Sequence, residues 1–464
     1  MAPLITYPYV SRILGAENLG CVNYTNSIIQ YLVLFSGLGI STYGIREAAK
    51  RREKKEQVEK FISECFTINI IFTLFAYGIF ACILWNARNE KKYFSLYVIQ
   101  SFLIIFSTIG IEWINTVFED YYYITIRTII VNIISIGSTF LLVHNEDDYL
   151  LYAVVNVITI GLVSVLNWIH YRKTISIKIV RYPHFKLHFK PIIIFFANKL
   201  AVTLYVSADT TMLGMMVGNY SVGIYSVSVK IYTILKNLLA AMYAVFLPRL
   251  SFVKGKNDEK AFKYIYSNLI SVLSLIIFPA SIGLFCLSKY IVILLFGNSY
   301  IESYVSLSIL SIAIIFAIYG GLVAAVYDVV MGLEKVALQS TIIAASINII
   351  INMLFLPIFK QNGAAVTTLL AELVTFTYCF FMSKGIFNYI DMKQILKNII
   401  HSFIGCIEII LIVWLAKAFI SSIIMVCVMS FFISVIFYFV TLVFLKNEYI
   451  YKGIKIYLNR TKKN

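Results

Sequence analysis

Charged residues are scarce in this chain of 464 residues: they make up 13% of it, about half the share found in a soluble domain. Hydrophobic residues make up 60%. They lie in continuous blocks, most of them about 20 residues long, the length that a helix needs to cross a bilayer. Continuous blocks also exclude the alternating pattern of a membrane β-barrel. The composition excludes a soluble globular protein and predicts an all-α, polytopic membrane helical bundle.

Motifs for nucleotide binding and hydrolysis are missing from the sequence. It holds no GxxxxGK[ST] loop, no GxSxG and no HExxH. None of the seven cysteines has a CxxC spacing, so we interpret them as small packing residues and not as disulfides or metal ligands. His184 and His188 form HxxxH, but in a basic joint without further metal ligands. No polar stretch is long enough to house a catalytic domain. We therefore predict no enzyme, no cofactor and no metal site.

Fourteen apolar stretches can be counted along the chain. We expect spans at 1–14, 24–45, 66–85, 94–114, 124–143, 150–169, 191–216, 222–247, 265–287, 302–326, 339–357, 363–383, 398–418 and 422–445. The first could reach only about 21 Å at 1.5 Å per residue, and Pro3 and Pro8 interrupt it. It lacks the charged start and cleavage site of a signal peptide. We interpret it as the outer half of a helix whose beginning is missing.

Lys and Arg are distributed unevenly between alternate joints, which predicts the orientation of the chain. One set of joints holds 29 of the 39 basic residues and the other set holds 7. The richer set comprises 46–60, Arg127, 172–190, 249–263, Lys335, 384–397 and the tail from Lys446. We expect this set, and with it the C-terminus, to be cytoplasmic. The net charge of +16 is thus mostly a topology signal, and its scatter over many joints argues against nucleic-acid binding.

An internal repeat is visible in the sequence. Gly20, Tyr24, Ser27 and Tyr31 before Arg46 are matched by Gly223, Tyr225, Ser228 and Tyr232 before Arg249. The distance from glycine to arginine is 26 residues in both copies. A parallel repeat of this kind predicts two pseudo-symmetric six-helix lobes. The expected regions are an N-terminal lobe at 1–171, a cytoplasmic linker at 172–190, a C-terminal lobe at 191–385, two appended spans at 386–445 and a basic cytoplasmic tail at 446–464.

Ionisable residues inside the predicted spans are candidate functional groups, because burying them in a membrane costs several kcal/mol. Asp209 and Lys230 both lie about 11 Å below the outer boundary on adjacent antiparallel spans. They form either a neutralising structural pair or a substrate-linked pair. Lys199 and Lys236 lie nearer the middle and have no acidic partner in their own hairpin. An anion supplied by the substrate would meet that need.

Two carboxyl groups are candidate proton sites, because burial favours the neutral acid. They are Glu372 on the twelfth span and Glu408 on the thirteenth. Asn132, Asn198, Asn348 and Asn352 either line a polar path or form hydrogen bonds between helices.

Several short motifs resemble a known family. Residues 3–15 (PLITYPYVSRILG) look like the end of the first helix of bacterial O-antigen and capsular polysaccharide flippases, and residues 39–47 (GISTYGIRE) resemble the motif that closes their second helix. Further matches are 123–127 (YITIR), 209–214 (DTTMLG) and 223–226 (GIYS). These flippases belong to the multidrug, oligosaccharidyl-lipid and polysaccharide exporter superfamily. The chain departs from the family in lacking most of the first helix before Pro3.

The resemblance implies two six-helix lobes around a cationic cavity. It implies a substrate, an oligosaccharide repeat unit on undecaprenyl diphosphate, which is moved from the inner to the outer leaflet of the bacterial inner membrane by alternating access. By position, the substrate-binding candidates are Arg12, Arg46, Lys199, Lys230 and Lys236. Asp209 would be their counter-charge and, with Glu372, a candidate for ion coupling. The coupling ion would be a proton or sodium, and a polysaccharide polymerase is a candidate partner.

Three other functions compete with this interpretation. An antiporter for cationic drugs would need acidic residues in its cavity, whereas the mid-membrane balance favours lysine. A polysaccharide polymerase or ligase would carry a long outer loop, and the predicted outer joints are short. A purely structural membrane protein would not need buried charges.

Overall fold

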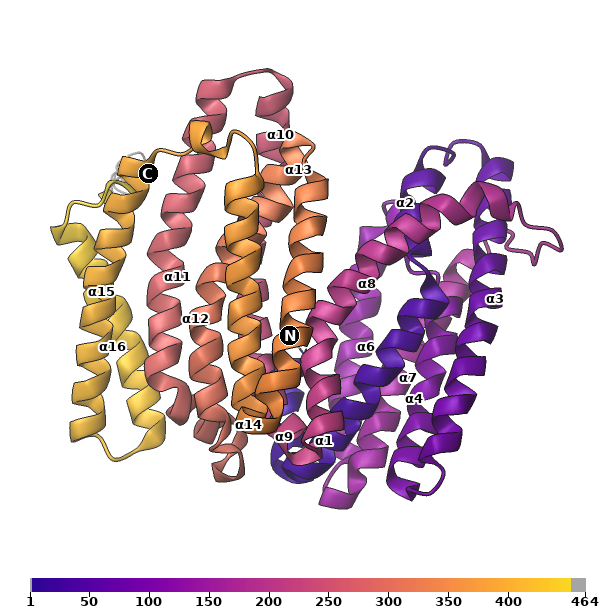
Figure 1. Ribbon diagram of the computed structural model, residues 1–464, viewed down its shortest axis with the longest axis horizontal. Coiled ribbons are helices and arrows are strands. Elements are labelled where there is room, and N and C mark those ends of the chain that lie inside the picture. Colours follow the sequence, from indigo (N-terminus) through magenta and orange to yellow (C-terminus); the bar gives the residue numbers. More distant parts are fainter. Residues whose placement is uncertain (1, 452–464) are drawn as a thin grey trace, which may run out of the picture. The chain divides into compact units, whose positions relative to one another are not determined.

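The computed structural model describes residues 2–451, and side chains from Leu4 onwards. The basic tail beyond Tyr451 lies outside the described residues. All regular secondary structure in the described part is helical (Figure 1). The first helices are α1 Ala2–Gly37, α2 Ile40–Ala49, α3 Lys55–Ala87, α4 Lys91–Ile109, α5 Trp113–Val117, α6 Tyr121–Leu142, η1 Glu146–Asp148, α7 Tyr149–Arg172 and α8 Phe185–Met216. The others are α9 Asn219–Ala244, α10 Leu247–Gly255, α11 Glu259–Phe296, η2 Asn298–Tyr300, α12 Ser303–Leu322, η3 Val323–Tyr327, α13 Asp328–Met331, α14 Glu334–Met382, η4 Ile386–Tyr389, α15 Met392–Phe419 and α16 Ile423–Phe444.

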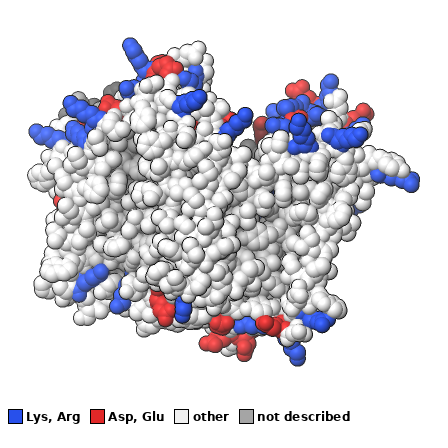
Figure 2. Space-filling view, viewed as in Figure 1, with Lys and Arg blue, Asp and Glu red and all other residues white. Residues whose placement is uncertain are grey.

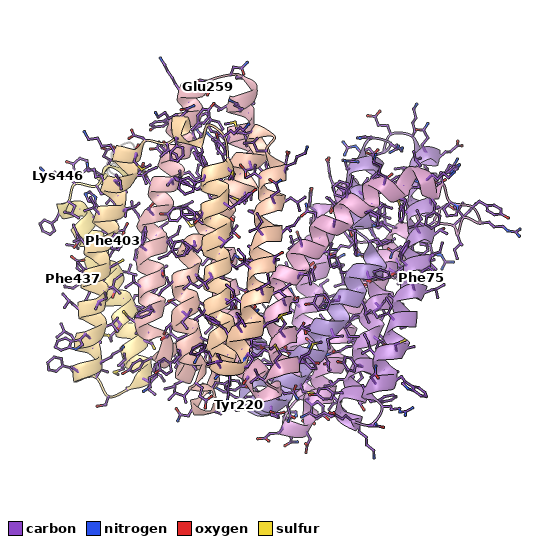
Figure 3. The ribbon with its side chains drawn as sticks, in the orientation of Figure 1. Phe75, Tyr220, Glu259, Phe403, Phe437 and Lys446 are labelled. Carbon is purple, nitrogen blue, oxygen red and sulfur yellow. The ribbon has the colours of Figure 1, made fainter. Side chains whose placement is uncertain are left out.

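Twelve helical ranges among the described residues are long and apolar enough to cross a membrane, so the expected count of fourteen spans is not confirmed. The prediction of an all-α, polytopic membrane bundle is confirmed. Large apolar side chains point outward from the flanks of the helices: Phe75, Phe403 and Phe437 are 62%, 52% and 55% exposed (Figure 3). Exposed apolar surface on this scale is suited to contact with lipid.

Helices α1 and α14 each contain one residue with non-helical backbone angles, and both helices turn back on themselves. Gly15 has φ 70° and ψ 170°, and Lys360 has φ 51° and ψ −131°. Asn23 donates a hydrogen bond to the Tyr7 hydroxyl at 3.1 Å, and Thr367 donates one to Asn352 Oδ1 at 2.7 Å. In a straight helix, residues 15 or 16 positions apart would be separated by about 22–24 Å. The chain therefore reverses at the two points where the sequence predicts joints between spans.

The helices form two compact units, residues 1–223 and 224–464. Helix α8, which the repeat would assign to the second lobe, contacts α1 and α2 in the first unit. The two units are defined by which helices contact each other, whereas the predicted lobes are defined by which helices correspond in the repeat. The units therefore do not test the lobe boundaries, which stay a prediction. The order of elements does recur. In both units a long helix is followed by a short one (α2, α10), then by two long helices of which the second ends in a short helix (α5, α13).

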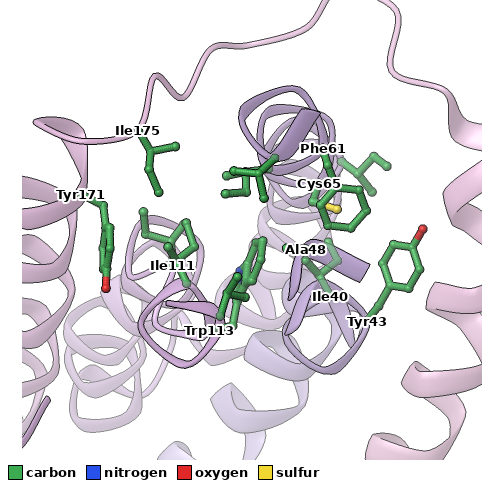
Figure 4. Close-up of a cluster of buried hydrophobic side chains, with 14 of the residues drawn as sticks. Ile40, Tyr43, Ala48, Phe61, Cys65, Ile111, Trp113, Tyr171 and Ile175 are labelled. Atoms are coloured by element: carbon green, nitrogen blue, oxygen red, sulfur yellow. The ribbon is translucent and has the colours of Figure 1, made fainter. Parts of the chain in front are cut away.

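The short helices of each unit pack on each other, α2 on α5 and α10 on α13. In the first unit this contact is part of a buried apolar cluster, and it includes Tyr43, Phe61, Trp113, Tyr171 and Ile175 (Figure 4). A methyl group on Gly44 would lie 2.8 Å from the Trp113 ring, so glycine lets α2 approach α5 closely. The cluster fixes α2, which carries Arg46, one of the candidate site residues.

On the face that Figure 2 shows, charged side chains gather at the helix ends of each unit and are sparse between them. In the first unit, Arg52 pairs with Glu119 at 2.7 Å at one end, and Lys92 donates to Asn18 at 2.6 Å at the other. In the second unit, Tyr327 donates to the Lys384 carbonyl at 3.0 Å at one end, and Gln361 donates to Glu302 at 3.3 Å at the other. Joints assigned to one side of the membrane therefore meet at one end of their unit.

The close packing of the repeat glycines yields the first prediction. A methyl group on Gly20 would overlap the carbonyl oxygen of Asn219, and one on Gly223 would overlap that of Ala16. Because both obstacles are backbone atoms, Gly20→Ala should destabilise the chain by about 1–3 kcal/mol or more. Gly137→Ala is the matched control, since it adds a methyl to a helix with no other atom within 4 Å. Thermal melts of the two purified variants in detergent should separate, with a lower melting temperature for Gly20→Ala. Equal melting temperatures would show that this contact is not tight.

Candidate functional site

A buried ion pair in the second unit brings together two of the predicted site residues. Lys236 on α9 lies 2.5 Å from Oε1 of Glu372 on α14. The hydroxyl of Tyr232, one turn before Lys236, donates to the same oxygen at 2.6 Å. Glu372 is 4% exposed, whereas the Lys236 side chain is 29% exposed. The carboxylate is thus shared by two donors from α9, and the lysine retains access to its surroundings.

The acidic partner of Lys236 comes from outside its own hairpin. Lys236 has no acidic partner in its own hairpin, but α14 supplies one from 136 residues away. For Lys236, the inference of an unpaired cation is therefore wrong. Lys230, two turns nearer the start of α9, is half-buried.

In the first unit, two predicted cations lie near the same stretch of α8. The Arg46 guanidinium on α2 sits over the Phe195 ring at 5.0 Å, and the Arg46 side chain is 52% exposed. Lys199 follows one turn after Phe195 on α8, and it is exposed. Gly39, just before α2, lets α2 lie close to α8. It has φ 71°, and a methyl group on it would lie 2.7 Å from the Phe196 nitrogen. Arg46 and Lys199 are therefore brought onto neighbouring surfaces of the same unit.

Asp209 and Arg12 occupy contrasting positions. Asp209 on α8 is 6% exposed. Two residues later, Thr211 donates to Ser27 at 2.8 Å, which ties this part of α8 to α1. Arg12 is exposed on the first arm of α1. Asp209 belongs to the first unit and Lys230 to the second, so their pairing stays a prediction.

Two of the asparagine candidates and Glu408 form hydrogen bonds within the second unit. Asn352 donates to Asn348 at 3.1 Å one turn earlier on α14, and its Oδ1 accepts from Thr367 on the other side of Lys360; both asparagines are buried. Glu408 accepts a hydrogen bond from Thr441 at 2.6 Å.

A buried network around Glu64 could not be found from the sequence. His184 and His188 each place a ring nitrogen on the Glu64 carboxylate, at 2.8 and 2.7 Å. The other nitrogen of His188 meets the Tyr43 hydroxyl at 2.8 Å. The HxxxH spacing was visible, but its acidic partner lies about 120 residues earlier on α3. The network joins the start of α8 to α2 and α3, and thus supports the helix that carries Lys199.

Arg127 is a second residue whose role the sequence did not show. It was expected to be a charge in a cytoplasmic joint, but its side chain is only 3% exposed. It contacts Glu112 at 2.9 Å and also bonds to Asn167. Asn167 in turn donates to the carbonyl of Gly110, where α4 is broken. Arg127 therefore stabilises a helix break.

The Lys236–Glu372 pair can be tested with a double-mutant cycle. Removing one partner leaves the other charge buried without its counter-charge, so Lys236→Ala and Glu372→Gln should each destabilise the chain. The double variant should be more stable than the sum of the two losses predicts, with a coupling energy of about 0.5–3 kcal/mol. Denaturation of the four purified proteins measures this energy. Strict additivity would show that the pair does not interact in solution.

Comparisons with known proteins agree with this fold. A protein-family model described as polysaccharide biosynthesis protein matches residues 9–306. A protein of Escherichia coli (strain K12) named "Putative O-antigen transporter" is 23% identical over 387 residues, which cover 80% of this chain and 90% of that protein. The capsular polysaccharide biosynthesis protein CapF of Staphylococcus aureus is 25% identical over 399 residues, which cover 82% and 94%.

A solved structure has the same fold. The lipid II flippase MurJ in its inward closed conformation aligns with a TM-score of 0.76, at 16% sequence identity, over 96% of this chain and 97% of that one. The family model covers well over half of the chain, and the expected resemblance is thereby confirmed. The chain is a multi-pass membrane protein that belongs to the polysaccharide biosynthesis protein family, a family of membrane transporters and not of enzymes.

Proposed function

We propose that this chain is a flippase that moves an oligosaccharide repeat unit, carried on undecaprenyl diphosphate, from the cytoplasmic to the outer leaflet of the bacterial inner membrane. One observation carries the proposal. Lys199 lies exposed within a membrane-spanning helix, and none of the ion pairs among residues 4–451 includes it. A cation held at membrane depth costs several kcal/mol unless it meets a charge or water.

A lipid-borne diphosphate is the charge that such a cation would meet. Desolvating a diphosphate is prohibitive, so it cannot cross about 30 Å of hydrocarbon unaided. Lys199 and Arg46 would bind it through charge-assisted hydrogen bonds, which are about twice as strong as neutral ones. Arg12 and Lys230 are further candidates for this role. The polyprenyl tail would stay in lipid while the sugars pass through the protein.

An ion gradient would supply the energy. Each charge moved across 100 mV contributes about 2.3 kcal/mol. Glu372 is the candidate coupling group in the second unit, because it is a buried carboxylate whose counter-charge, Lys236, keeps access to its surroundings. If Lys236 moved away, the released carboxylate would take up a proton or sodium. Asp209 would act in the first unit, and the two lobes would alternate access to the two leaflets.

The topology belongs to the same proposal. The two arms of α14, 334–359 and 361–382, would reach about 39 and 33 Å at 1.5 Å per residue, so each can cross the membrane alone. If the arms of α1 are also counted separately, the chain would have fourteen spans, of which the first is short. The ends that hold the joints 46–60 and 384–397 would be cytoplasmic, as would the C-terminus.

Restored export in a strain that lacks the gene for this chain tests the proposal. The wild-type chain should restore surface polysaccharide. Lys199→Ala should lower it about tenfold or more, the effect of losing one charge-assisted hydrogen bond of about 1.5–3 kcal/mol. Lys199→Arg keeps the charge and should export. Lys91→Ala is the control, since Lys91 is an exposed lysine at a helix end. Full export by Lys199→Ala at equal membrane abundance would refute the role of this cation.

A further inference from the structure

The end of α12 departs from regular α-helical geometry. Residues 323–327 form a π-helical turn, and the four-residue helix α13 begins directly after it at Asp328. Gly332 then adopts φ 71° and closes the segment. Single π-helical turns inside α-helices are rare and occur frequently at functional sites. This turn lies at the end of the second unit where the joints 249–263 and 384–397 are found.

Asp328 is a buried carboxyl group with one oxygen unused. It is 0% exposed, and its Oδ1 accepts a hydrogen bond from Ser383 at 2.6 Å. Within the described part of the chain, its Oδ2 has no hydrogen-bond partner. No ion pair found among residues 4–451 includes Asp328. The hydroxyl of Tyr266 on α11, whose ring lies 5.5 Å from that of Tyr327, is also buried without a partner.

The surrounding ionisable groups do not supply a positive charge to Asp328. They are Arg249 and Lys254 on α10, Tyr266 on α11, Tyr327 beside Asp328, Glu334, Lys335 and Cys379 on α14, and Lys384 and Tyr389 in the joint that follows. Lys254 is held by Glu259 at 2.8 Å and by the Tyr389 hydroxyl at 2.9 Å. A lone buried carboxylate is costly and is normally neutralised by a proton. Burial without a counter-charge therefore favours the neutral form of Asp328.

Asp328 lies where the end of α12 is hydrogen-bonded to the segment that follows α14. Its bond to Ser383, and the bond from Tyr327 to the Lys384 carbonyl at 3.0 Å, tie the end of α12 to the segment after α14. Beside the π-helical turn is an apolar cavity of about 180 Å³, lined in part by Val323 and Tyr266. The cavity leaves room for the turn to rearrange without displacing packed side chains.

We propose that Asp328 is a proton-binding site that controls this end of the second unit. The neutral acid keeps the end of α12 fastened to the segment after α14. When water reaches Oδ2, the acid gives its proton to that water, which passes the proton on to the solvent, and the hydrated carboxylate holds the segment open. Rebinding of a proton closes it again. A role of Asp328 in coupling protons to transport rests on the proposed function above.

The buried thiol of Cys379 reports on this opening. It is 0% exposed, and its carbonyl accepts the Ser383 N–H at 2.9 Å. In a full-length variant that keeps Cys379 and has the other six cysteines replaced by serine, the rate of labelling by N-ethylmaleimide measures access. The labelling rate of this variant and that of the same variant carrying Asp328→Asn are each measured from pH 5.5 to pH 8.5. The thiol of Cys379 ionises in both proteins, so taking the ratio of the two labelling rates cancels most of the pH dependence that this ionisation causes.

We expect equal rates at pH 5.5, because the amide mimics the neutral acid. At pH 8.5 the Asp328 chain should be labelled about tenfold faster than Asp328→Asn. A nearby carboxylate by itself would slow labelling by disfavouring the thiolate, so electrostatics alone predicts the opposite sign. Glu334→Gln, at an exposed acid on the same side, should keep the Asp328 profile. A ratio that stays at one, or faster labelling of Asp328→Asn, would overturn the proposal.

A second variant covers the case in which Asp328→Asn does not fold. Ser383→Ala removes the hydroxyl that fastens Oδ1 and should speed labelling at pH 5.5; an unchanged rate would count against the site. Export is measured in parallel. If the wild-type chain fails to restore export while the labelling ratio rises with pH, the proposed function fails and the proton site stands.

Discussion

A charge inside an apolar helical shell must be met by a partner, and this constraint organises the molecule. Most of the charges in the interior satisfy it within the protein. Lys236 meets Glu372, Arg127 meets Glu112 and Asn167, and Glu64 meets two histidines. These contacts join helices that are distant in the sequence. Removing one member would strand the other in a low-dielectric surrounding, so they hold the helices in register.

Lys199 and Asp328 depart from this pattern, and they carry the functional argument. Lys199 is exposed within a spanning helix, one turn after Phe195, whose ring lies under the Arg46 guanidinium. Asp328 is fully buried with one oxygen unused. A positive group open to its surroundings suits an anionic cargo. A neutral acid at a π-helical turn suits a proton that comes and goes. The two sites lie in different units, so binding of cargo and binding of a proton can be tested separately.

The sequence predicts the helices well because long apolar runs leave few alternatives. It also places the joints near Gly15 and 358–362, since prolines and polar residues interrupt the runs there. It does not reveal that the two arms of α1, and the two arms of α14, would follow one another at Gly15 and Lys360 without a loop between them, so that twelve helical ranges are found where fourteen stretches are expected. The pairing of Lys236 with Glu372 was out of reach, because nothing local relates residues 136 positions apart. Arg127 looked like a joint charge because its burial depends on α4 and α7.

Binding of lipid-linked diphosphate to the purified chain tests the central claim most directly. Undecaprenyl diphosphate and undecaprenol share the same tail, so their difference in affinity isolates the contribution of the phosphates. Our account predicts that the diphosphate binds about tenfold tighter or more, and that Lys199→Ala removes most of this preference while leaving undecaprenol binding unchanged. Equal affinity for the two lipids, or a preference that survives Lys199→Ala intact, would contradict it.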